Sequence, residues 1–132
     1  MSSKWRRWWF STICVVLVLW GIVFAVAGLR VLPVERNVLL QWESALYGAI
    51  MIGWGTTLFW VGRIALRRDD TELIKPLLLG IVVWLVVEAA YSARFGVWFN
   101  VGVDAGVLVL FGVPLIATLR SARGRGRGGC AR

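Results

Sequence analysis

The sequence contains no histidine, and its two cysteines, Cys14 and Cys130, lie near opposite ends of the 132 residues. Without histidine there is no His-ligated haem, zinc or copper site and no nucleophile activated by an imidazole. Two distant cysteines without a CxxC motif provide neither a disulfide framework nor a thiol–disulfide enzyme. Acidic residues are also few, seven Asp and Glu against 15 Lys and Arg. From these absences we expect no metal, no cofactor and no enzyme activity.

Apolar segments make up most of the sequence. Hydrophobic residues are 59% of the chain, above the roughly 45–50% of a soluble domain. Four segments approach or exceed the ~20 residues that a membrane-spanning helix needs: residues 10–29, 43–66, 73–93 and 99–119. The sequence therefore predicts an all-α membrane protein, a four-transmembrane-helix bundle of one domain with a short hairpin between the third and fourth spans.

The basic residues predict the orientation of this bundle. They lie almost entirely between the apolar segments, which indicates membrane topology rather than nucleic-acid binding. On one side stand Lys4, Arg6, Arg7, Arg63, Arg67, Arg68, Lys75, Arg120, Arg123, Arg125, Arg127 and Arg132, and on the other Arg30, Arg36 and Arg94. The positive-inside rule then places both termini in the cytoplasm, and a bacterial-type inner membrane is the expected location.

Residues 120–132 contain the run Arg-Gly-Arg-Gly-Arg-Gly-Gly, a composition that predicts a flexible basic cytoplasmic tail rather than a packed element. Such a tail can bind RNA or anionic lipid, and contact with lipid headgroups is the favoured interpretation. The expected partners are therefore anionic lipids at both basic termini. A second copy of the chain or a larger membrane protein is a further candidate, and nucleic acid is disfavoured.

The first apolar segment has a competing interpretation. Its basic start, apolar run and Ala25-Val-Ala27 resemble a signal peptide that is cleaved before Gly28. We favour an uncleaved helix, because the run is long for the apolar core of a signal peptide.

Glycines mark two candidate packing faces. Gly48, Gly55 and Gly62 recur every seven residues, nearly two helical turns, so they share one stripe that permits close backbone approach. We favour an intramolecular seam over a dimer face. Gly102 and Gly106 form a GxxxG pair on the opposite side of the fourth segment from Asp104.

Two acidic residues lie inside the last two spans. An acid near the centre of a spanning helix costs about 2.5–3.5 kcal/mol, so it needs partners or a function. Counted from the intervening turn, Glu88 and Asp104 lie at depths within roughly 3 Å of each other, in the outer half of the bilayer. Helical spacing and depth predict a ligand-binding or ion-binding cluster of Glu88, Asp104, Tyr91, Ser92, Asn100, Glu43 and Tyr47, with Arg94 as counter-charge.

Three roles for this cluster remain open at this stage. In the favoured one, the acids are polar contacts between helices of a non-enzymatic accessory or structural subunit of a membrane assembly. The alternative is a small transporter or channel subunit that binds a cation, proton or small amine at an outward-facing Glu88/Asp104 cluster. The least favoured is a membrane enzyme that uses the two acids on a lipid substrate.

N-terminal sequencing of the mature protein tests the first span. If residues 10–29 remain as a helix, the membrane-extracted protein begins at or next to Met1. A mature N-terminus at Gly28 would contradict this expectation and leave three spans.

Overall fold

A computed structural model describes residues 2–28 and 38–128, with side chains as far as Arg123. Within these residues the chain forms four α-helices: α1 (Ser3–Ala27), α2 (Val38–Arg68), α3 (Thr71–Arg94) and α4 (Trp98–Gly128). Each is long and apolar enough to cross a membrane. The all-helical fold with four membrane-type helices is therefore confirmed. Of the connection predicted between the first two spans, residues 30–37 lie outside the described residues, and residues 38–42 already belong to α2.

The helices extend further than the apolar segments. Ser2 caps α1 by accepting a hydrogen bond from the backbone N–H of Trp5 at 3.3 Å, so the basic, Trp-rich stretch before residue 10 is helical. α4 continues through Arg120 to Gly128, which differs from the irregular tail predicted for residues 120–132. Extending a formed helix adds one hydrogen bond per residue and arginine favours that extension, whereas Gly124, Gly126 and Gly128 oppose it. Residues 129–132 lie outside the described residues.

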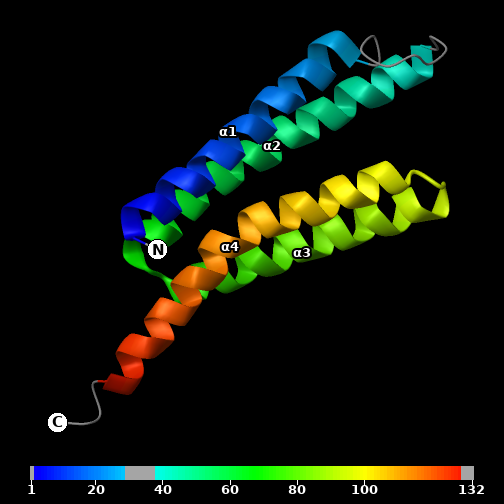
Figure 1. Ribbon diagram of the computed structural model, residues 1–132. Helices are drawn as coiled ribbons and strands as arrows, with labels where there is room; N and C mark the ends of the chain where they lie inside the picture. Colours follow the sequence, from blue (N-terminus) through cyan, green and yellow to red (C-terminus); the bar gives the residue numbers. More distant parts are fainter. Residues whose placement is uncertain (1, 29–37, 129–132) are drawn as a thin grey trace.

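The four helices form two antiparallel hairpins. α1 packs mainly on α2 and α3 mainly on α4, with smaller contacts between α1 and α4 and between α2 and α3. Figure 1 shows the hairpins close together near the N-terminus of α1 and further apart toward the α3–α4 turn. We call the first end, which holds Arg6, Arg7, Arg63, Arg67 and Arg120, the basic end, and the other the turn end.

The glycine stripe of α2 faces α1. A Cβ at Gly48 would overlap the backbone of Ala25, and a Cβ at Gly62 would overlap the ring of Phe10. Gly55 also lies close to α1, since a Cβ added there would be 2.8 Å from the Val18 side chain. Without side chains at these positions the two helices approach closely and gain dispersion contacts, which drive helix association in lipid. The stripe is thus part of the contact within the first hairpin.

Fully buried side chains gather in the basic half of the bundle, where the two hairpins meet. Phe10 of α1 packs edge-to-face on Phe111 of α4, with ring centroids 5.4 Å apart. Around them lie the fully buried side chains of Cys14, Leu58, Ala65, Ile74, Ile81 and Leu115. Toward the turn end, the buried hydrophobic side chains among the described residues are Leu17, Met51 and Leu85, none of which is fully buried.

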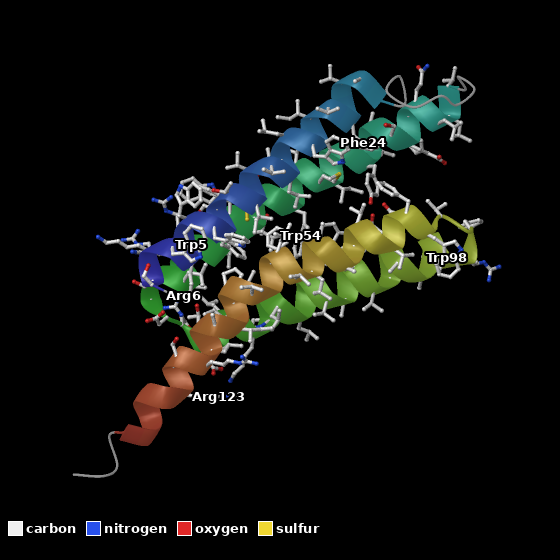
Figure 2. The ribbon with its side chains drawn as sticks, viewed as in Figure 1. Trp5, Arg6, Phe24, Trp54, Trp98 and Arg123 are labelled. Atoms are coloured by element: carbon white, nitrogen blue, oxygen red, sulfur yellow. The ribbon has the colours of Figure 1, made fainter. Side chains whose placement is uncertain are left out.

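Arg6 joins both hairpins at the basic end, although its position in the sequence suggests only a topology-setting charge. Its side chain is buried, and Nη1 donates hydrogen bonds to Thr118 Oγ1 at 2.9 Å and Ser121 Oγ at 3.4 Å. Nη2 lies 3.7 Å from Asp69 Oδ1 in the α2–α3 turn. Asp69 has a φ of 50°, a left-handed conformation that Asp tolerates better than most residues. Figure 2 shows Arg6 at this junction, with Trp98 and Arg123 toward the two ends of α4.

The glycine contact leads to a stability prediction. Replacing Gly48 with alanine should lower the free energy of unfolding by about 1–3 kcal/mol, because the added methyl must push α1 backbone away. Gly53 of the same helix is the matched control, since a Cβ there meets nothing within 4 Å. Gly53→Ala should be neutral or stabilise by up to about 1 kcal/mol through helix propensity.

Denaturation of both variants in the same detergent measures the difference. Equal effects of the two substitutions would contradict the close α1–α2 contact.

Candidate functional site

A cavity of about 230 Å³ occupies the half of the bundle toward the turn end. Residues of all four helices line it, and Phe111 separates it from the buried core of the basic half. Its walls are mostly apolar and include the aromatic side chains of Trp20 and Phe24 from α1 and Trp84 from α3. The cavity therefore lies between the two hairpins, on the turn-end side of the region where they pack closely.

Polar side chains converge at the turn end of this cavity. Tyr47 of α2 donates a short hydrogen bond to Glu88 Oε1 of α3, which links the two hairpins. Asn100 Nδ2 donates to Ser92 Oγ at 2.9 Å and lies 3.5 Å from Asp104 Oδ2. Asp104 is only 4% exposed. We call Tyr47, Glu88, Ser92, Asn100 and Asp104 the polar cluster.

The cavity combines two carboxylates with no basic side chain. Glu88 and Asp104 both line it, and no Lys or Arg is among its described lining residues. Taking a carboxylate out of water is costly unless it is paired or neutralised. Tyr47 and Asn100 supply one neutral hydrogen-bond donor to each acid, and no cationic side chain among the described lining residues pairs with either.

The structure brings together five of the eight residues named from the sequence and leaves three outside. The five are the polar cluster, of which all but Ser92 line the cavity. Glu43, Tyr91 and Arg94 are exposed, and within the described chain no side-chain hydrogen bond or salt bridge involves them. Arg94 ends α3 and does not provide the counter-charge expected of it.

The glycine pair of α4 lies away from the cavity. A Cβ at Gly102 or at Gly106 would meet nothing within 4 Å, whereas Asp104 between them is buried. α4 therefore turns its acid inward and its glycines outward.

Sequence reasoning missed the aromatic walls of the cavity. Trp20 and Phe24 are four residues apart on α1 and pack edge-to-face with centroids 5.5 Å apart, a spacing visible in the sequence. Nothing in the sequence fixed how α1 is rotated, so this pair was indistinguishable from lipid-facing aromatics. Arg6 was missed for the same reason.

No known family model, curated protein or solved structure matches the chain.

The hydrogen bond between Tyr47 and Glu88 should stabilise the closed arrangement of the hairpins. A double-mutant cycle of Tyr47→Phe and Glu88→Met, which removes the acceptor oxygen, should give a coupling free energy of about 0.5–1.7 kcal/mol, the range measured for such bonds in membranes. Tyr91→Phe is the matched control, because Tyr91 is 62% exposed and three residues from Glu88. A coupling for Tyr47 no larger than that for Tyr91 would show that the bond contributes nothing.

Proposed function

We propose that this small integral membrane protein is non-enzymatic and binds an organic cation in the cavity between its hairpins. The observation that carries the proposal is the composition of the cavity: two carboxylates, aromatic walls and no basic residue among the described lining. Acids within the spans of a membrane protein that lack a counter-charge mark a candidate site for a cation or proton, and here Asp104 is buried and Glu88 half-buried. This reverses the order of preference that the sequence alone suggested.

The arrangement suits an amine with a small apolar body. The ammonium group would lie between Glu88 and Asp104, where a charge-assisted hydrogen bond to each carboxylate is available. The apolar part would lie against Trp20, Phe24 and Trp84, whose ring faces also attract cations. The volume of about 230 Å³ falls below the ~300–1,000 Å³ of drug-sized sites, so the ligand is of single-ring size or smaller.

The hydrogen bond between Tyr47 and Glu88 supplies a means of access. It is the side-chain hydrogen bond that joins the hairpins at the turn end in the described chain. An arriving ammonium group competes with the Tyr47 hydroxyl for Glu88, and release of that hydroxyl allows the hairpins to separate. With the basic end in the cytoplasm, as the distribution of Lys and Arg favours, the polar cluster lies in the outer half of the membrane.

A role as an accessory subunit is the second candidate, and the outward glycine pair favours it. Gly102 and Gly106 leave an open strip on α4 against which a second helix could pack closely. Co-purification of a larger membrane protein that is lost on Gly106→Leu would support this role.

Thermal stabilisation of the purified protein tests cation binding. Benzylammonium should raise the melting temperature more than the neutral benzyl alcohol at equal concentration, since binding to the folded state stabilises it. Glu88→Gln and Asp104→Asn should each weaken the apparent affinity at least tenfold, because each removes one partner of a desolvated charge pair.

Glu43→Gln is the matched control, since Glu43 is an exposed acid near the same end that does not line the cavity. Equal stabilisation by the alcohol, or an equal loss in the Glu43 variant, would contradict the proposal.

A further inference from the structure

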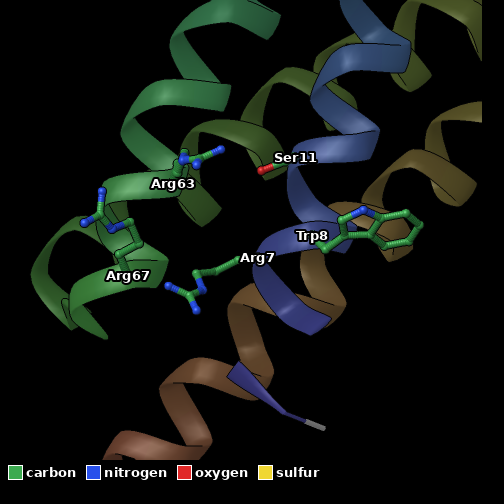
Figure 3. A pocket seen from close by; sticks show the side chains of 5 residues that line it. All are labelled: Arg7, Trp8, Ser11, Arg63 and Arg67. Carbon is green, nitrogen blue, oxygen red and sulfur yellow. The ribbon is translucent and has the colours of Figure 1, made fainter. Parts of the chain in front are cut away.

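A separate cavity of about 350 Å³ lies at the basic end between α1 and α2. Its lining residues are Arg7, Trp8 and Ser11 of α1 and Arg63 and Arg67 of α2. Figure 3 shows arginines contributed by both helices near one another, with the Trp8 ring directed away from them. None of these residues lines the cavity that holds Glu88 and Asp104.

The positive charge of this cavity is not offset by the acids nearby. Asp69 lies 3.7 Å from Arg6, and Asp70 caps α3 through backbone N–H groups. Glu72 pairs with Lys75 at 3.0 Å. The two salt bridges of the described residues thus leave out all three arginines of the cavity. Three guanidinium groups around one space are complementary to a phosphate group, which they bind through paired N–H donors.

An apolar groove continues from the arginines along the same seam. Arg7, Ser11, Val15 and Val18 follow one another at helical spacings of four, four and three, so they form one stripe of α1. Arg67, Arg63, Phe59 and Thr56 repeat these spacings on α2. Because the two helices are antiparallel neighbours, both stripes run from the basic end toward the middle of the bundle.

A third cavity lies on this seam, toward the middle of the bundle. It measures about 160 Å³ and is lined by Cys14, Val15, Val18, Leu19, Thr56 and Phe59. At about 1.5 Å per residue, Val15 lies roughly 12 Å along α1 from Arg7. The Arg63 guanidinium lies 5.9 Å from the centroid of the Phe59 ring, so the charged and apolar parts are in contact.

We propose that this seam binds an anionic phospholipid. The phosphate group lies among Arg7, Arg63 and Arg67, and one acyl chain follows the groove past Phe59 to Val15. Trp8 is 63% exposed beside the arginines, as expected of a tryptophan at the level of lipid headgroups. The positive-inside rule assigns the basic end to the cytoplasmic leaflet, where anionic lipids interact with basic side chains. A free phosphate compound would use the arginines but leave the apolar groove empty.

Lipid-dependent thermal stabilisation of the full chain in a neutral detergent tests the site. Phosphatidylglycerol should raise the melting temperature more than phosphatidylcholine with the same acyl chains. The double variant Arg63→Gln/Arg67→Gln should bind phosphatidylglycerol on the order of 10-fold more weakly. The matched control, Arg120→Gln/Arg123→Gln, removes the same charge from the same end outside the seam and should bind as the unmodified chain does.

A second variant tests the groove without altering any charge. Val15→Trp should fill the apolar cavity and weaken binding of phosphatidylglycerol while leaving the arginines in place. Val87→Trp, at an exposed position of α3 that lines none of these cavities, is its control and should have no effect. Each variant is compared with its own melting temperature without lipid, so an altered baseline does not obscure the result.

Three results would overturn the proposal. Equal losses in both arginine double variants would mean attraction to the overall charge of the basic end. Equal stabilisation by phosphatidylcholine would remove the role of the headgroup charge. Equal stabilisation by glycerol phosphate, with no effect of Val15→Trp, would indicate a site for free phosphate rather than for a lipid.

Discussion

Close packing of the two hairpins at their basic ends determines the rest of the structure. There Phe10 packs on Phe111. The buried Arg6 guanidinium donates a hydrogen bond to Thr118 of α4 and lies beside the α2–α3 turn. The first hairpin is closely packed, because glycines let α2 approach α1. Two rigid pairs joined at one end separate toward the other, and the cavity forms where that separation begins. The position of the candidate site is therefore a consequence of where the core lies.

The polar groups obey the same physical constraint at both ends of the bundle. A charge inside a membrane protein must be paired, neutralised or kept near water. Arg6 meets this requirement with Thr118, Ser121 and Asp69. Glu88 and Asp104 meet it only partly, because their partners are neutral. Arg6 contacts three side chains from α4 and the α2–α3 turn, which suits a structural role, whereas the half-buried Glu88 and the buried Asp104 have only neutral partners.

The fold was largely predictable from the sequence, because the length and apolar content of a spanning segment are local properties. The glycine spacing of α2 likewise predicted a seam, and it lies against α1. The depths of Glu88 and Asp104 followed from counting residues outward from one turn, and the two acids do share a cavity. What counting could not supply is the rotation of each helix. Trp20 and Phe24 face the cavity, and Tyr91 and Arg94 face away from the polar cluster, for reasons of packing between hairpins rather than of local spacing.

A structure determined with bound 4-bromobenzylammonium tests the central claim most directly, because anomalous scattering locates the bromine independently of the protein. We expect one bromine peak per chain among Trp20, Phe24 and Trp84, with the ammonium group within hydrogen-bond distance of Glu88 and Asp104. Bromine only at the lipid-facing surface, or a cavity that holds an acyl chain with the two acids pointing away from it, would contradict the account.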